Sequence, residues 1–280
     1  MKLEPDLAET YLDLMKMCLT RYIFPDALRP LRRPSCPKFN VAWAMYHLIS
    51  KILEKNGLRI CRYVKFDPAS RAEGLDYPPD ADTMVGLRRL DNIQFCIAQV
   101  LREEIPGDFI EAGVWRGGAA IFMRAALKAY RDATRQVWVA DSFEGLPKPD
   151  GRYPQDEGDR HWTMNHVLAT SLEEVKFNFS RYGLLDERVH FLKGWFKDTL
   201  PNAPIERLAL LRLDGDMYSS TMDSLQSLYP RLSTGGYVII DDYGGIDACR
   251  KAVDDFRAEK RIQTPITPID RLGVYWKKPG

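Results

Sequence analysis

The sequence predicts an α/β protein built around a doubly wound parallel sheet, and two observations lead to this prediction. From about residue 106 onward, short apolar runs alternate with segments of helical periodicity, which is the pattern of a parallel sheet with crossover helices. Several of the expected strands end in glycine or acidic residues, as strands do where an open α/β sheet forms a ligand site. With 280 residues and 45% hydrophobic composition, the chain can bury a large core, which excludes a mainly disordered protein.

The N-terminal third is expected to be helical. Residues 4–23 carry apolar side chains at the spacing of an amphipathic helix. A basic, proline-rich stretch follows at 25–37 and cannot sustain a helix. Two more helices are expected over about 40–55 and 80–102. We therefore expect residues 1–104 to form a helical cap on a domain of residues 105–280.

The C-terminal part divides into short strands and longer helices. Five strands are expected, at 109–112, 137–141, 189–192, 208–213 and 237–241. The helices are expected at 119–130, 171–182, 220–229 and 247–259. Two short segments at 265–269 and 273–277 fit a terminal hairpin or edge strands.

Composition excludes several classes of protein. A formal net charge of +1 argues against a general nucleic-acid binder, which usually carries a clear basic excess. The five cysteines show no zinc-ligand spacing and are expected to be free thiols in a reducing compartment. The first 21 residues lack a signal-peptide core, and no apolar run reaches the length of a membrane span. We expect a cytoplasmic protein without membrane or nucleic-acid partners.

The first expected strand runs into a glycine-containing loop, EAGVWRGG at 111–118. Glycine lets the backbone approach a ligand closely. The spacing differs from the GxGxxG pattern that places a dinucleotide pyrophosphate against a helix N-terminus. The acid Glu111 would repel phosphate, but it suits a ligand that carries an ammonium or sulfonium group. The alternative for the glycines taken alone is an ordinary strand-to-helix turn.

A second acid, Asp141, ends the next expected strand. An acid at this place can accept hydrogen bonds from both hydroxyls of a ribose. Together, the glycine loop, the acid and the lack of a phosphate cradle predict S-adenosylmethionine rather than NAD as the cofactor.

Three acids end the last two expected parallel strands. Asp214 follows one strand, and Asp241 with Asp242 follows the other. Neighbouring strands lie about 4.8 Å apart, so these carboxylates should converge and repel one another unless a cation neutralises them. Oxygen ligands without Cys or His favour Mg²⁺ or a similar ion over zinc. The alternative is helix capping, which would explain Asp216 and Asp247 but leaves the other three acids unexplained.

Several motifs, taken in order, resemble the macrocin O-methyltransferase (TylF-type) family. They are TMVGLRRLDN at 83–92, EAGVWRGG at 111–118, DSFEGLP at 141–147, GWFKDTLP at 194–201, DGDMYSST at 214–221 and DDYGG at 241–245. That family includes enzymes that methylate sugar hydroxyls of macrolide and aminocoumarin antibiotics. The resemblance covers about residues 71–277 and implies a class I methyltransferase fold, a Rossmann-like sheet of seven strands with the last antiparallel.

The resemblance also implies roles for individual residues. Mg²⁺ would be held by Asp214, Asp241 and Asp242, with Asp214 also acting as general base. The methionine moiety would contact Thr83, Met84 and the loop residues Glu111, Ala112, Gly113, Trp115 and Gly117. The ribose would contact Asp141, with Ser142 and Phe143 next to it, and the adenine would lie near Gly194 and Trp195.

The sequence thus predicts a Mg²⁺-dependent, S-adenosylmethionine-dependent O-methyltransferase whose small-molecule acceptor is a hydroxyl, expected on a glycoside. A phenolic or catechol-type acceptor is the main alternative, and a non-catalytic binding module is a third hypothesis. His161 lies in a polar loop and is either an auxiliary base or a solvated residue of a lid. The amphipathic helix at 4–23 and the basic arm after it predict a homodimer or larger homo-oligomer.

Overall fold

The computed structural model describes residues 6–24, 28–31, 41–76, 78 and 80–280, and most of the basic stretch at 25–37 lies outside these ranges. Within them, seven strands form one sheet in the order β5-β4-β3-β6-β7-β9-β8. Neighbours from β5 to β7 pair in parallel, whereas β9 runs antiparallel to both β7 and β8. The strands are β3 (Asp108–Ala112), β4 (Val137–Asp141), β5 (Val189–Lys193), β6 (Leu208–Leu213), β7 (Leu232–Ile240), β8 (Thr267–Pro268) and β9 (Val274–Lys277). This confirms the predicted sheet, including the terminal hairpin.

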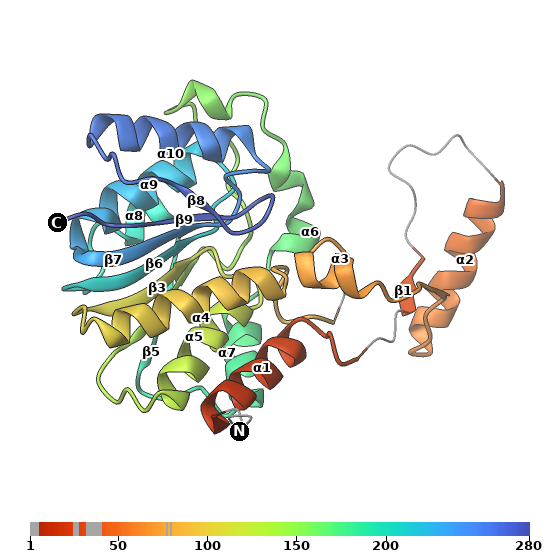
Figure 1. The fold of residues 1–280 in the computed structure, drawn as a ribbon. Helices are drawn as coiled ribbons and strands as arrows, with labels where there is room; N and C mark the ends of the chain where they lie inside the picture. The colour runs from red at the N-terminus through yellow and green to blue at the C-terminus, as the bar shows by residue number, and fades with distance from the viewer. Residues whose placement is uncertain (1–5, 25–27, 32–40, 77, 79) are drawn as a thin grey trace.

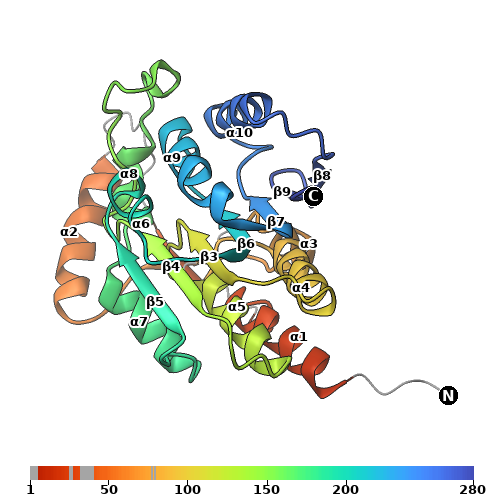
Figure 2. The ribbon, with the colours of Figure 1, turned by 90° about the vertical axis from the view of Figure 1, so that its left-hand side faces the viewer.

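Helices cover both faces of the sheet (Figures 1 and 2). One face carries α1 (Leu7–Leu19), α4 (Leu87–Arg102), α5 (Gly118–Ala129) and α7 (Leu172–Arg181). The other carries α8 (Phe196–Thr199), α9 (Tyr218–Leu228) and α10 (Asp247–Glu259). Each face has its own apolar core, because strand side chains alternate between the two faces. Among the described helices, none is both long and apolar enough to cross a membrane.

The first helix packs one side against the rest of the chain. Leu12, Met15 and Leu19 are buried in the core that also holds β3 and α5. Contacts with α5 and α4 cover this side, whereas Leu7 and Leu14 stay 85% and 51% exposed. The predicted homo-oligomer stays a prediction.

The helix expected over 80–102 begins at Leu87, because Gly86 is its N-cap and has extended backbone. A Cβ on Gly86 would lie 2.2 Å from the carbonyl oxygen of Ala72, so a side chain there would collide with α3 (Pro68–Glu73). Residues 80–86 instead form a loop, which leaves Met84 free to reach the edge of the sheet.

A small appendage projects away from the sheet domain (Figure 1). It consists of a two-stranded antiparallel ribbon, β1 (Leu28–Pro30) and β2 (Cys61–Tyr63), and of α2 (Val41–Lys55). The sequence predicted α2 but not the ribbon, whose strands are too short for a periodic signal. The apolar side chains of α2 that stay exposed are Met45, Leu48, Ile49 and Ile52.

Candidate active site

A cavity of about 360 Å³ opens at the carboxyl ends of β3, β4 and β6. The chain proceeds outward from β3 to β4 and β5, then returns to place β6 on the other side of β3. Such a switch point is where open α/β sheets bind ligands. The predicted site residues that line the cavity are Met84, Gly113, Trp115, Asp141, Ser142, Gly194, Trp195 and Asp214.

The loops after β3 and β6 lie against each other at the base of the cavity. Gly113 has φ +90°, and a Cβ there would lie 1.8 Å from the carbonyl oxygen of Asp214. Only glycine fits this position, because any side chain would push the two loops apart. Trp115 also has positive φ (47°), and its indole Nε1 donates to the carbonyl oxygen of Val167 at 3.0 Å. Trp115 thus lines the cavity and also ties the glycine loop to the segment above it.

Asp141 joins the loops after β3 and β4. Its Oδ2 accepts from the backbone N–H of Val114 at 2.8 Å, and its Oδ1 accepts from that of Phe143 at 2.8 Å. Burial raises the pKa of Asp141, and these hydrogen bonds oppose the rise. The carboxylate has lone pairs left for a ligand, since each oxygen can accept more than one hydrogen bond.

Five predicted cofactor contacts do not line the cavity. The Thr83 hydroxyl accepts from the Val85 N–H, and Phe143 is buried. Gly117 is the N-cap of α5 and lies against Val175, and Ala112 is buried within β3. Glu111 points to Arg212, its neighbour on β6, and burial raises its pKa to about 8 although Arg212 opposes this. The Glu111 side chain is therefore engaged by Arg212 beneath the cavity, and its contact with the cofactor stays a prediction.

An acidic cluster lies beside the cavity, formed by Asp214, Asp216 and Asp242, whose nearest carboxylate oxygens all lie within 4.8 Å of one another. Burial raises the pKa of all three. Repulsion from Asp241 adds to the rise at Asp214, and repulsion from Asp214 adds to it at Asp242 and at Asp216, whose pKa rises to about 7. The Oδ2 oxygen of Asp242 is buried and has no hydrogen-bond partner among the described residues. Crowded acids with an unpartnered oxygen and no Cys or His among them fit a hard divalent cation.

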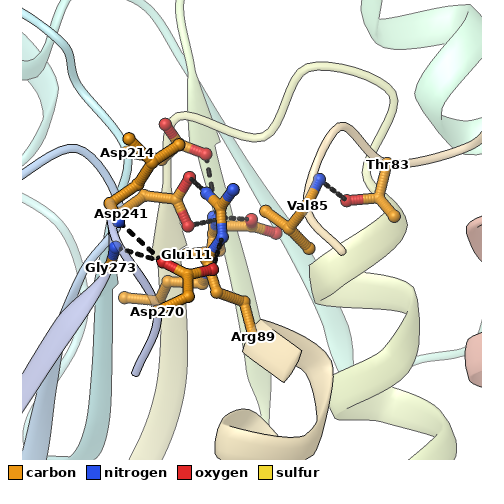
Figure 3. Close-up of polar contacts among 10 residues, drawn as sticks. Thr83, Val85, Arg89, Glu111, Asp214, Asp241, Asp270 and Gly273 are labelled. Carbon is orange, nitrogen blue, oxygen red and sulfur yellow. Dashed lines mark hydrogen bonds and ion pairs between the residues drawn. The ribbon is translucent and has the colours of Figure 1, made fainter. Parts of the chain in front are cut away.

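The cluster differs from the predicted one in a single member, because Asp216 takes the place of Asp241. The carboxylate of Asp241 is engaged by two buried guanidinium groups, those of Arg89 and Arg212 (Figure 3). Burial alone would raise the pKa of Asp241, but the two cations outweigh it and hold the pKa below its usual value. Asp241 and Asp242 are adjacent residues, and one carboxylate faces the arginines while the other joins the acidic cluster.

His161 forms a dyad with Asp159, whose Oδ2 lies 2.7 Å from the His161 Nδ1. The hydrogen bond to Asp159, together with the charges of Asp159 and Asp216, raises the pKa of His161, although partial burial opposes this. His161 is half-exposed and is not among the residues that line the cavity.

The segment between β4 and α7, residues 142–170, contributes several residues to the lining of the cavity and is tied to α9. Asp156 is buried, and its two oxygens accept from the N–H groups of Tyr218 and Ser219 at 2.8 and 2.9 Å. This carboxylate caps α9, so the alternative that Asp216 caps this helix was wrong. The sequence could not show this, because Asp156 lies more than sixty residues from the helix it caps.

The strand order, the antiparallel strand β9 and the cavity at the switch point are together the features of a class I methyltransferase. The structure of the O-methyltransferase NovP superposes on this chain with a TM-score of 0.83 and 43% identity, covering 98% of this chain and 100% of that one.

Sequence comparison gives the family. The chain matches the family described as Macrocin-O-methyltransferase (TylF) over residues 8–278, and it belongs to that family. It is 50% identical to the 8-demethyl-8-(2,3-dimethoxy-alpha-L-rhamnosyl)-tetracenomycin-C 4'-O-methyltransferase of Streptomyces olivaceus, over 97% of this chain and 94% of that one. It is 48% identical to the Mycinamicin III 3''-O-methyltransferase of Micromonospora griseorubida, over 96% of each. The protein is an S-adenosylmethionine-dependent O-methyltransferase.

Proposed function

We propose that this enzyme methylates a sugar hydroxyl of a glycosylated natural product in antibiotic biosynthesis. The observation that carries the proposal is the similarity along nearly the whole chain to two enzymes whose names specify tetracenomycin and mycinamicin acceptors, the first of them rhamnosylated. The lining of the cavity supports it, because it carries charged side chains that can hydrogen-bond to sugar hydroxyls and an aromatic ring that can pack against a sugar. Its lining includes Lys148, Asp150, Arg152, Phe196, Lys197 and Asp223.

The cofactor would occupy the half of the cavity nearer β3 and β4. Asp141 is placed to accept from the ribose hydroxyls, and Met84, Gly113 and Trp115 would surround the methionine moiety. Gly194 and Trp195, which follow β5, would lie against the adenine.

Asp214 is the proposed general base, since its carboxylate lines the cavity next to Gly113. As the acceptor oxygen forms its bond to the methyl carbon, the carbon–sulfur bond breaks, and Asp214 takes the hydroxyl proton. The products are the methyl ether and S-adenosylhomocysteine. Asp214, Asp216 and Asp242 would hold Mg²⁺, which lowers the pKa of a bound hydroxyl and so makes its oxygen a better nucleophile. Asp241 is not among these proposed metal ligands, because Arg89 and Arg212 engage its carboxylate.

His161 is proposed as an auxiliary group on the acceptor side. Its Nδ1 is paired with Asp159, so Nε2 is the ring nitrogen that would contact the acceptor, and the charge of Asp216 acts on the same ring. This dyad would orient the hydroxyl or pass its proton to solvent.

The test of this function is a methyl-transfer assay with labelled S-adenosylmethionine and Mg²⁺. The acceptors are a panel of glycosides, their aglycones and a catechol. We expect label in the sugar of one or more glycosides, no label in the matched aglycones, and loss of transfer in excess chelator. Transfer to the catechol alone would favour the phenolic alternative, and full transfer in chelator would contradict the metal site.

We also propose that the protein forms a homo-oligomer, because α2 exposes apolar side chains. Met45, Leu48, Ile49 and Ile52 are each 44–64% exposed on this projecting helix, and covering them would remove apolar surface from water. Light scattering should show a dimer or larger assembly, which Leu48→Glu with Ile52→Glu should dissociate. A wild-type monomer would contradict this proposal.

A further inference from the structure

A chain of buried ion pairs runs from the last loop of the fold to the cavity (Figure 3). Asp270 accepts from the N–H groups of Leu272 and Gly273 at 2.8 and 2.7 Å, which fixes its carboxylate in a turn before β9. Its Oδ2 lies 3.0 Å from Nε of Arg89, on the first turn of α4. Arg89 in turn donates through Nη1 to Oδ2 of Asp241.

Arg212 on β6 continues this chain to the cavity. Its Nη2 donates to Oδ1 of Asp241 and, at 3.0 Å, to Oδ2 of Asp214, while its Nη1 donates to Glu111. The Arg212 and Glu111 side chains are only 1–2% exposed, whereas that of Asp214 is 29% exposed and lines the cavity. One fully buried cation therefore holds the carboxylate that faces the reacting groups.

Fold stability does not account for this arrangement. Burying charges costs solvation free energy, and apolar residues of similar volume often serve a core as well or better. The planar guanidinium group of Arg212 donates to two carboxylates, those of Asp214 and Asp241, and so fixes their relative orientation, which apolar residues cannot do. Arg89 and Arg212 also neutralise Asp241, which would otherwise add to the repulsion within the acidic cluster.

We propose that Arg89 and Arg212 are positioning residues that hold the Asp214 carboxylate against Asp216 and Asp242. Arg212 acts on Asp214 directly, whereas Arg89 acts through Asp241. This inference rests on the proposed function of the acidic cluster. Arg89 lies on the first turn of α4, and the loop that brings Met84 to the cavity ends just before this helix.

The experiment compares Arg89→Gln and Arg89→Lys with a matched control, Arg124→Gln. Arg124 forms a two-pronged pair with Asp186 (3.0 and 2.6 Å), and neither residue lines the cavity. The readouts are Mn²⁺ affinity by electron paramagnetic resonance, S-adenosylhomocysteine affinity by calorimetry, melting temperature, and crystal structures of the full-length variants.

We expect Arg89→Gln to weaken Mn²⁺ binding at least tenfold, to change S-adenosylhomocysteine affinity less than threefold, and to turn the Asp214 carboxylate away from the cluster. Arg89→Lys, which keeps the charge but loses the fork, should restore part of the Mn²⁺ affinity. Arg124→Gln should lower the melting temperature comparably and leave Mn²⁺ affinity unchanged.

Unchanged or tighter Mn²⁺ binding in Arg89→Gln would overturn the inference, because then the guanidinium only supports the fold or repels the ion. Equal weakening in Arg124→Gln would also overturn it. If wild-type protein binds no Mn²⁺, the proposed metal site fails, and the crystal structures decide the inference separately. In that case a displaced Asp214 in Arg89→Gln supports positioning, and an unmoved one overturns it.

Discussion

At the scale of single residues, Asp214 is where the cavity, the acidic cluster and the buried arginines meet. It lines the cavity, lies near two other raised-pKa acids and accepts a hydrogen bond from Arg212. No other carboxylate among the described residues has all three relations. This makes Asp214 the residue at which the proposed chemistry is tested most directly.

We expect Asp214→Asn to lower kcat by about 100-fold or more, the usual size of a lost general base. The loss should exceed that of Asp216→Asn, which removes a charge from the cluster but not the proposed proton acceptor. Asp247→Asn is the control, because its fully exposed side chain lies at the start of α10. Steady-state kinetics with a glycoside acceptor measure this, and a fully active Asp214→Asn variant would exclude the proposed base.

Asp141→Ala should weaken binding of S-adenosylmethionine by about 10- to 100-fold, since bonds to a charged group are worth about 1.5–3 kcal/mol. Asp141→Asn should lose less, because an amide oxygen can still accept from one of the two backbone N–H groups. Calorimetric titration gives the affinities, and circular dichroism shows whether the fold is intact. Unchanged affinity in the alanine variant would place the ribose elsewhere.

The acidic cluster predicts a pH-dependent effect of Mg²⁺ on stability. The pKa of Asp216 is about 7 in the folded protein, above its ordinary value of 3.8, so the folded state disfavours its ionised form. Its contribution to stability is therefore present below about pH 4 and is lost as pH rises toward 7. Mg²⁺ binds the ionised carboxylates and should raise the melting temperature more at pH 8 than at pH 5. Scanning calorimetry with Mg²⁺ or chelator tests this, and equal shifts at both pH values would contradict it.

At the scale of elements, loops rather than strands carry the site, and long-range contacts hold the loops. Asp141 links the loops after β3 and β4, and Asp156 links the 142–170 segment to α9. Trp115 and Phe143 adopt positive φ in loops next to the cavity, as does Asp216 in the acidic cluster. Such strained positions persist where surrounding contacts over-determine the backbone, and they are common at functional sites.

Asp156→Ala should destabilise the protein by about 1–2 kcal/mol, because two backbone N–H groups of α9 lose their capping acceptor. The KM for the acceptor should also rise, since the 142–170 segment is no longer tied to α9. Asp247→Ala is the comparison, because Asp247 makes no capping hydrogen bond at the start of α10. Urea unfolding measures the difference, and similar stabilities of the two variants would refute the capping role.

At the scale of the whole molecule, the N-terminal helices and the sheet form one packed body, from which α2 and its ribbon project. The buried side of α1, with Leu12, Met15 and Leu19, lies on α5. Helix α4 contacts the acid Asp241, which follows β7, through Arg89. Residues on both sides of the boundary predicted near residue 104 share one core, while the ribbon of β1 and β2 with α2 is the part that stands apart.

Leu12→Ala tests this packing. Leu12 is fully buried between α1 and the core, so the substitution should cost about 2–5 kcal/mol of unfolding free energy. Leu14→Ala on the exposed side of the same helix should cost less than about 0.5 kcal/mol. Urea denaturation separates the two, and equal costs would mean that α1 is not part of the folding unit.

The sequence by itself determined the alternation of strands and helices, the loop glycines and the acids at the strand ends. These features follow from local rules: side chains alternate along a strand, and parallel strands bring their carboxyl ends to one edge. The motifs also determined the family. The helix start at Leu87 was missed because contact with α3, not local periodicity, ends the preceding loop.

Only the tertiary structure decided which acids act together. Asp241 and Asp242 are neighbours in the chain, yet Arg89, 152 residues from Asp241, engages one carboxylate and leaves the other in the acidic cluster. Glu111 turns to Arg212 because strand register places the two side by side. Electrostatic pairing depends on distance through space, and burial magnifies it by excluding water. A sequence shows neither quantity, so the roles of Arg89, Arg212 and Asp216 became visible only in the folded chain.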